Sequence, residues 1–190
     1  MKKRLGPGDT FFPVPAALVV SGTMDEPNII TIAWTGMMSS SPPTVAVSLR
    51  NTRFSLEKIR ERGDFTVNIP PARLFKEVDY CGLVSGRDAD KFAVTGLHAI
   101  ESSLVGAPII DECPYNMECR VTGEREIGQW VVLFGEIVET HCDEDKTDET
   151  GTRVDVSKAD PLAYCAVVRE YRELGRKLGD GFKAGKELKE

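Results

Sequence analysis

The chain has few of the residue patterns that mark metal-binding sites or catalysis by side chains alone. Its five cysteines form no Cys-x-x-Cys pair, and His98 and His141 are its only histidines. These spacings argue against a disulfide scaffold, a structural zinc site and an iron–sulfur centre. No Gly-x-Gly-x-x-Gly follows a strand, and no Ser/His/Asp arrangement, paired carboxylates or nucleophile motif is found. A dedicated dinucleotide domain and an acid/base constellation are therefore not expected.

Long apolar runs and a basic excess are also missing. No run approaches the roughly 18 apolar residues of a membrane span, and Met1-Lys-Lys-Arg4 is followed by Gly6-Pro7-Gly8 rather than by a signal-peptide core. The formal net charge is −6, without the basic footprint of a general nucleic-acid binder. We therefore expect a cytoplasmic protein with no membrane or nucleic-acid partner.

The chain is long enough to form one domain with its own core. It has 190 residues, of which 41% are hydrophobic, and a chain of this length buries about 70% of its unfolded surface on folding. No repeat or linker divides it, so we expect a single domain over residues 1–190. Residues 174–190 mix charge with glycine, which predicts a tail that is mobile or laid over a neighbour.

Alternating residues and breaker residues predict strands joined by short helices. Strands are expected at 16–21, 29–33, 44–49 and 64–69, and residues 116–122 and 130–140 are expected to form a hairpin. Helices are expected from Phe54 to Gly63, over 72–80 with Gly82 as C-cap, and over 88–93 ending near Gly96. The sequential hairpins favour an antiparallel barrel over a parallel α/β sheet. The acidic segment 143–151 is expected to be a solvated loop without chemistry.

The segment from Ser48 to Ser55 is a candidate anion site. A strand end runs into a helix start, where Asn51 or Thr52 is the expected N-cap and where Arg50 and Arg53 add positive charge. Free N–H groups and the positive end of the helix dipole attract a phosphate group. The alternative is an ordinary capped surface helix with exposed arginines, since N-caps far outnumber phosphate sites.

The segment from Asn28 to Gly36 is a candidate site for a planar ligand. The apolar run 29–33 predicts a buried strand, and residues 34–39 break that pattern with a turn of small polar residues. Glycine and threonine at such a turn let backbone N–H and C=O groups approach the edge of a flat ring. The alternative for Trp34 and the two following methionines is that they fill the core, as large apolar groups usually do.

Several motifs follow one another along the chain in a recognisable order. They are Asn28…Thr31-Ile-Ala-Trp-Thr-Gly36, Pro42-Pro43, Ser48-x-Arg50-x-Thr52-Arg53-x-Ser55, Asn68-Ile-Pro70, Asp79-Tyr-Cys-Gly82, Ser85-Gly86 and Asp90-Lys-Phe92. This order resembles the flavin reductase-like, FMN-binding split-barrel family, and within it the flavoredoxin branch. The resemblance covers roughly residues 12–172 and depends on the ordered series, because each motif alone is weak. It implies a mainly β protein, a six-stranded antiparallel split barrel with peripheral helices, and FMN near the interface of a homodimer.

The resemblance also assigns binding roles to particular residues. The isoalloxazine and ribityl chain would be lined by Thr31, Ala33, Trp34, Thr35 and Gly36, with Asn28 at the start of the same motif. The phosphate and ribityl hydroxyls would be bound by Ser48, Arg50, Thr52 and Ser55. Ser85 and Lys91 would approach from the Asp90-Lys-Phe92 segment, with Lys91 facing either the flavin edge or the phosphate. General statistics favour a solvent-exposed side chain for Lys91.

Cys81 belongs to the Asp79-Tyr-Cys-Gly82 motif and is included among the candidate cofactor-binding residues. Its sulfur would lie near the ring if the motif positions it there. The alternative is a buried, inert thiol, because cysteine is among the most buried residue types.

The expected chemistry comes from the cofactor. Flavins transfer electrons and hydride themselves, and the protein positions the ring and tunes it. Two function classes stay open: an FMN-dependent NAD(P)H oxidoreductase that reduces flavin or a small acceptor, and a flavoredoxin-like carrier that passes electrons to a redox protein partner. A flavin-binding protein of other activity is the third alternative.

Overall fold

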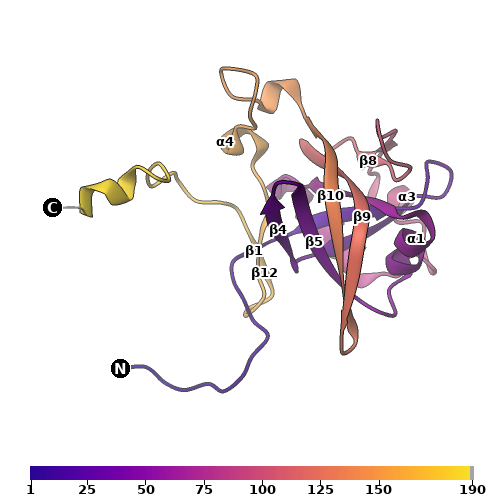
Figure 1. Cartoon of the computed structure of the whole chain (residues 1–190), viewed down its shortest axis with the longest axis horizontal. Helices are drawn as coiled ribbons and strands as arrows, with labels where there is room; N and C mark the ends of the chain where they lie inside the picture. The colour runs from indigo at the N-terminus through magenta and orange to yellow at the C-terminus, as the bar shows by residue number, and fades with distance from the viewer. Residues whose placement is uncertain (189–190) are drawn as a thin grey trace.

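The computed structural model describes residues 1–188 and is dominated by one antiparallel sheet. Its seven strands hydrogen-bond in the order β3-β2-β6-β9-β10-β5-β4 (Figure 1). They are β2 (Ala17–Ser21), β3 (Asn28–Ile32), β4 (Thr35–Ser40), β5 (Pro43–Arg50), β6 (Asp64–Ile69), β9 (Tyr115–Ile127) and β10 (Trp130–Cys142).

The two edge strands of this sheet, β3 and β4, are consecutive in the chain and are separated only by Ala33 and Trp34. β3 pairs with β2, and β4 pairs with β5. The chain therefore passes from one edge of the sheet to the other within two residues, which closes the sheet into a barrel. With β3 and β4 counted as one broken strand the barrel has six strands, and the predicted antiparallel split barrel is confirmed.

Short helices and two small sheets surround the barrel. The helices are α1 (Phe54–Arg62), α2 (Phe75–Leu83), α3 (Lys91–Thr95) and α4 (Val156–Ala159), with 3-10 turns η1 (Ala72–Leu74), η2 (Glu144–Lys146) and η3 (Ala184–Leu188). One small sheet joins β1 (Val14–Pro15), β11 (Ala163–Cys165) and β12 (Glu170–Arg172), and the other joins β7 (Ala99–Ile100) and β8 (Ile109–Ile110). Within residues 1–188, no helix has the length and apolar character needed to span a bilayer.

The barrel separates two apolar cores, because β2 is buried on both of its faces. Ala17 and Val19 point into the barrel, where Phe65 is the largest fully buried side chain. Leu18 and Val20 point outward, into a second cluster formed with α2, α3 and β11. The outer cluster holds the helices against β3, which is the strand that ends at Ile32, just before Ala33.

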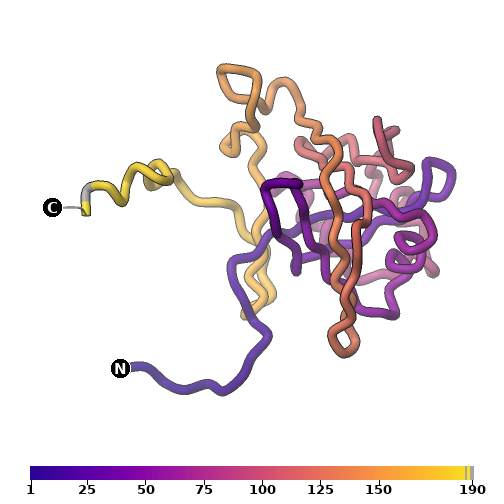
Figure 2. The backbone as a smooth tube through the Cα atoms, viewed as in Figure 1, coloured from indigo at the N-terminus to yellow at the C-terminus, as the bar shows by residue number. Residues whose placement is uncertain are grey.

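Two terminal segments leave this body. Residues 1–13 and 174–188 extend away from the barrel on the side of β1 and β12, and every described side chain in them is exposed (Figure 2). We call them the N-terminal arm and the C-terminal arm.

Two expectations at helix ends are wrong. The N-cap of α1 is Arg53, with no side-chain cap hydrogen bond, and not Asn51 or Thr52. Those two residues instead form the turn that leaves β5, closed by the Arg53 N–H donating to the Arg50 carbonyl at 3.0 Å. Gly82 is not a C-cap but lies inside α2, which continues to Leu83.

Two element boundaries also differ from expectation. The turn predicted over residues 34–39 is wrong, because residues 35–40 form β4 by pairing with the backbone of β5, which a sequence pattern does not reveal. The third helix begins at Lys91 and not at residue 88, because the Asp90 carboxylate accepts from the Ala93 N–H at 3.1 Å and caps it there.

Gly135 on β10 gives a direct test of barrel packing. A Cβ atom at Gly135 would lie 2.5 Å from Cζ of Phe65, whereas one at Gly123 on β9 would meet nothing within 4 Å. We expect Gly135→Ala to lower the free energy of unfolding by about 1–3 kcal/mol, the usual cost of overpacking a core. The control Gly123→Ala should leave it unchanged or slightly raised. Urea unfolding of both variants measures this, and equal stabilities would contradict the described core.

Candidate functional site

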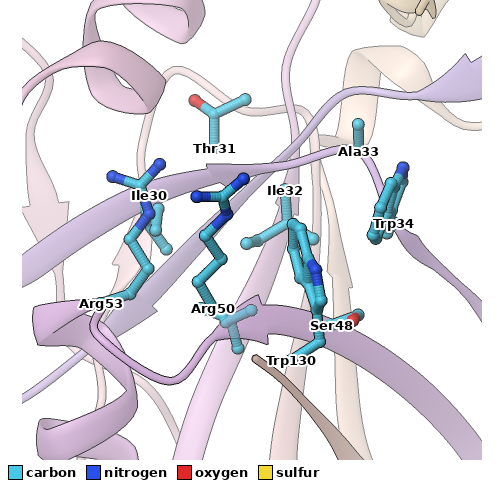
Figure 3. Close-up of a pocket in the computed structure, with 10 residues that line it drawn as sticks. Ile30, Thr31, Ile32, Ala33, Trp34, Ser48, Arg50, Arg53 and Trp130 are labelled. Carbon is cyan, nitrogen blue, oxygen red and sulfur yellow. The ribbon is translucent and has the colours of Figure 1, made fainter. Parts of the chain in front are cut away.

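A hollow of about 150 Å³ lies where β3 ends, beside the β5–α1 turn and the start of β10 (Figure 3). It is lined by Ile30, Thr31, Ile32, Ala33, Trp34, Ser48, Leu49, Arg50, Arg53 and Trp130. We call it the tryptophan–arginine hollow. Residues of the barrel strands β3 and β5 line the hollow, together with Ala33 and Trp34. The two-residue step that closes the barrel therefore also sets the position of the hollow.

The two tryptophans of the chain meet at one side of this hollow. Trp34 lies in the break between β3 and β4, and Trp130 begins β10, where it pairs in register with Arg50. The indole centroids are 4.2 Å apart at an interplanar angle of 34°, and the Arg50 guanidinium lies 5.4 Å from the Trp130 ring centre. These groups form an aromatic platform with a cation beside it.

The positive side of the hollow is the start of α1. Arg50 and Arg53 extend side by side toward Thr31 (Figure 3). No side chain caps the helix, and of its first turn the Leu56 N–H already donates to the Arg53 carbonyl at 3.0 Å. The N–H groups of Phe54 and Ser55 are left for an anion, together with the two guanidiniums. Glu57 in the first turn partly offsets this charge, but its carboxylate pairs with Arg87.

A buried hydrogen bond between the side chains of Asn28 and Ser55 joins β3 to α1 beneath the candidate site. The Asn28 side-chain amide donates to Ser55 Oγ at 2.7 Å, and both residues are buried. This bond links the first residue of β3 to the first turn of α1. Gly86 packs against it, since a Cβ there would lie 1.9 Å from Asn28 Oδ1.

Lys91 is 4% exposed, so the alternative of a solvent-exposed side chain is wrong. Its Nζ donates to the carbonyls of Cys81 and Val84 at 3.0 and 3.1 Å, which satisfies acceptors at the C-terminal end of α2. Burial lowers the pKa of Lys91 below its usual value. With Asn28 it lines a neighbouring hollow of about 320 Å³, the lysine hollow, whose other lining residues are Asp25, Glu26, Pro27, Ile29, Phe54, Lys58, Gly86, Ala89 and Asp90.

A third hollow of about 210 Å³ adjoins the first through Thr31 and Ala33, which line both. Its remaining walls are Ala16, Asp79, Gly82, Leu83, Tyr164 and Tyr171. The Tyr171 hydroxyl donates to Asp79 Oδ1 at 3.1 Å, and the two tyrosine rings are 5.1 Å apart. Burial, with the nearby Asp79 carboxylate, raises the Tyr171 pKa. This tyrosine hollow brings the outer sheet of β1, β11 and β12 to the edge of the candidate site.

The chain matches the family model of the flavin reductase like domain over residues 9–175. It belongs to this family. The flavoredoxin of Desulfovibrio vulgaris (Miyazaki F) is 37% identical with a TM-score of 0.91, and the match covers 97% of this chain and 100% of that chain. The flavoredoxin from Methanosarcina acetivorans is 31% identical with a TM-score of 0.91, covering 99% and 100%. An uncharacterized protein of Archaeoglobus fulgidus is 37% identical over 70% of this chain and 75% of its own length.

Membership confirms the resemblance seen in the ordered motifs and makes this chain a flavin reductase-like flavoprotein. Of the residues assigned from the resemblance, the structure gathers Thr31, Ala33, Trp34, Ser48 and Arg50 in the tryptophan–arginine hollow. The others lie around it: Thr35 and Gly36 on β4, Thr52 in the turn before α1, Ser55 beneath that turn, and Asn28 and Lys91 in the lysine hollow. Ser85 follows α2, where its Oγ accepts from the Arg87 N–H at 3.2 Å.

Five residues that line the tryptophan–arginine hollow were not among the predicted cofactor-binding residues: the apolar Ile30, Ile32 and Leu49, and also Arg53 and Trp130. Arg53 was expected to add positive charge at the candidate anion site but was not assigned to the cofactor from the resemblance, and Trp130 lies far away in the sequence. The sequence of β10 does not reveal which residues of another strand lie beside its first residue, Trp130. The pairing of Trp130 with Arg50 is what brings it to the site.

Within the described part of the chain, no cysteine lines any of the three hollows, so Cys81, a candidate cofactor-binding residue, lies outside them. All five are free, and Cys81, Cys113 and Cys119 are buried. Burial raises the pKa of Cys81 to about 11, so this thiol stays neutral at ordinary pH. Within residues 1–188, no cluster of three or more His, Cys, Asp or Glu side chains could hold a metal ion.

Thiol labelling tests this assignment. At about pH 8 a small alkylating reagent reacts with accessible thiolates, so we expect modification of Cys142 and Cys165 and none of Cys81, Cys113 or Cys119. Peptide mass mapping measures it, with the denatured protein as the control in which all five react. Labelling of Cys81 at the rate of Cys142 would contradict its burial.

Proposed function

We propose that this flavoprotein is an FMN-dependent oxidoreductase that takes electrons from NADH or NADPH and passes them to a flavin or another small acceptor. The observation that carries the proposal is the tryptophan–arginine hollow, which joins the stacked Trp34–Trp130 pair to two arginines and an uncapped helix start. A flat ring and a terminal phosphate are the two parts of FMN that suit these two sides. Bound FMN supplies the hydride and electron transfer.

The chain's own groups would orient the ring. The indoles of Trp34 and Trp130 already touch at 4.2 Å, so the isoalloxazine would lie against the pair and not between its members. The Thr35 hydroxyl donates to the Ala46 carbonyl at 2.7 Å, so at that position backbone groups rather than the hydroxyl would face the ring edge. Ser48 also lines the hollow.

The phosphate would be held at the start of α1. Arg50 and Arg53 supply charge there, and the helix supplies N–H groups. Lys91 is a third cation near this end, with two of its donors used by the carbonyls of Cys81 and Val84. An ammonium group has three donors, so one is left for an anion.

A flavoredoxin-like electron carrier is the second candidate. The observation that favours it is the likeness to two flavoredoxin structures, each with a TM-score of 0.91. In that case a redox protein, not a nicotinamide, would meet the flavin. The expected homodimer and the cytoplasmic location stay predictions under either candidate.

Anaerobic stopped-flow mixing separates the two candidates. The FMN-loaded protein is mixed with NADH or NADPH, and flavin bleaching is followed. For the oxidoreductase we expect reduction within about 0.1 s or faster, the range of ordinary turnover. Reduction slower than any useful turnover with both nucleotides, together with fast reduction by a low-potential redox protein, would contradict the oxidoreductase and support the carrier.

The phosphate assignment predicts that FMN binds more tightly than riboflavin or FAD, with one FMN per chain. Arg53→Ala and Arg50→Ala should each weaken FMN by about 1.5–3 kcal/mol, the value of a hydrogen bond to a charged group. Riboflavin, which has no phosphate, should be affected far less. Titration of the apoprotein by flavin fluorescence measures this.

Arg62→Ala is the matched control, because Arg62 lies in the last turn of the same helix. It should bind FMN as the unmodified chain does. Equal binding of riboflavin and FMN to the unmodified protein would show that the phosphate is not held at this end of α1.

A further inference from the structure

The tyrosine hollow has an aromatic wall and an acidic group that the proposed function does not use. Tyr164 on β11 and Tyr171 on β12 are directly paired in register, so their half-buried side chains share one face of the outer sheet. The ring centroids are 5.1 Å apart at an interplanar angle of 44°. Two tilted rings at this spacing form a wall against which another flat ring can pack.

Helix α2 forms the opposite wall of the hollow. Asp79, Gly82 and Leu83 line it, and their spacing of three and four residues places them on one face of the helix. At Gly82 the helix backbone lies close to β3, since a Cβ there would touch the Thr31 Cβ at 3.4 Å. The Thr31 hydroxyl also donates to the Val78 carbonyl of the helix. The hollow is therefore a preformed space between α2, the end of β3 and the outer sheet.

The hollow has room for one ring and lies beside the candidate flavin site. Its volume is about 210 Å³, and a cavity of about 150 Å³ in a protein core can hold one benzene molecule. Thr31 and Ala33 line both this hollow and the tryptophan–arginine hollow. A ring bound here would therefore be the immediate neighbour of a flavin bound there, as a molecule that exchanges electrons with the flavin must be.

Asp79 gives the hollow its charge and a hydrogen-bond acceptor. Among the described residues that line the hollow, Asp79 is the only carboxylate and none is basic. The Tyr171 hydroxyl donates to Asp79 Oδ1 at 3.1 Å, which is the one hydrogen bond to this side chain within residues 1–188. Because burial and the Asp79 carboxylate raise the pKa of Tyr171, the phenol stays protonated and keeps this bond. Oδ2 can therefore accept a hydrogen bond from a ligand.

These features select a ligand by its charge and by its hydrogen bonds. The Asp79 carboxylate repels an anionic ligand, because no basic side chain among the described lining residues offsets it. It favours a neutral ring that carries an N–H or O–H group, which can donate to Oδ2. A dinucleotide suits the hollow less well, since its two phosphates are anionic.

We propose that the tyrosine hollow binds the small acceptor, that it takes a single neutral ring with an N–H or O–H group, and that Asp79 excludes anionic rings. Asp79 would accept the hydrogen bond from the ligand, and Tyr171 would be the positioning residue that holds the carboxylate in place. The ligand's identity as an acceptor rests on the proposed function, whereas the ring site and its preference for neutral ligands do not.

Three compounds of nearly equal shape test the proposal on the full, FMN-loaded chain. Benzamide is neutral with an N–H donor, acetophenone is neutral without one, and benzoate is an anion. By NMR of ring-labelled tyrosines, we expect benzamide to shift the signals of Tyr164 and Tyr171 and to leave those of Tyr80 and Tyr115 in place. It should bind about threefold more tightly than acetophenone and about tenfold more tightly than benzoate. Equal affinities, or no shift at Tyr164 and Tyr171, would overturn the proposal.

Two variants separate the charge of the carboxylate from its position. Asp79→Asn removes the charge and keeps the shape, so the preference for benzamide over benzoate should fall about threefold or more. Tyr171→Phe keeps the charge and removes the positioning bond, so benzamide should bind more weakly while its preference over benzoate is retained. The control Asp111→Asn changes an exposed carboxylate that lines none of the three hollows and should alter neither quantity. A preference that survives Asp79→Asn would contradict the role of Asp79.

Competition identifies the natural occupant of the hollow. NAD⁺ that leaves benzamide bound supports the acceptor, whereas NAD⁺ that displaces it would assign the hollow to the nicotinamide ring and overturn the proposal. The titration is repeated on the apoprotein, where displacement of benzamide by added FMN would assign the hollow to the flavin and also overturn it. A chain that binds benzamide as expected but does not bind FMN would count against the proposed function and leave the ring site intact.

Discussion

The two-residue step from β3 to β4 is the constraint on which the rest of this structure depends. A sheet with two free edges is open to pairing with other chains, and here Ala33 and Trp34 join the first edge directly to the last. Because the chain leaves one strand pairing and enters another at this point, neither residue belongs to a regular strand. The step that closes the barrel is therefore also a break in its regular strands, and the aromatic platform of the candidate site lies there.

The other parts of the site are fixed by their links to this break. β5 pairs with β4 and then turns into α1, which sets Arg50 and Arg53 beside the end of β3. The buried bond from Asn28 to Ser55 holds α1 to the start of β3. β10 pairs with β5 in a register that puts Trp130 opposite Arg50. Backbone pairing thus positions both the aromatic side and the charged side of the hollow. A flat ligand with an anionic tail needs a site in which these two sides are held in place before it binds.

Local patterns predicted the elements well and the contacts between distant elements poorly. Alternation and Gly63 located β5, α1 and β6, because those signals lie within a few residues of each other. The strand character of residues 35–40 depends on β5, and the place of Trp130 depends on the β5–β10 register, so neither could be found locally. The burial of Lys91 has the same origin, because its side chain is paired with the end of a different helix. The ordered motifs identified the family, although none of them reveals who donates or accepts the electrons.

The central claim is that a flavin binds against Trp34 and Trp130. These are the only tryptophans in the chain, so the two indole N–H signals in a ¹⁵N–¹H NMR spectrum report on this site and on no other. The account predicts that both signals shift as FMN is added and stop shifting at one FMN per chain. The reason is that the ring-current shift caused by a bound flavin is felt only within a few ångströms of its ring. If FMN binds, as followed by its own absorbance, while both indole signals stay in place, the flavin lies elsewhere and the account is wrong.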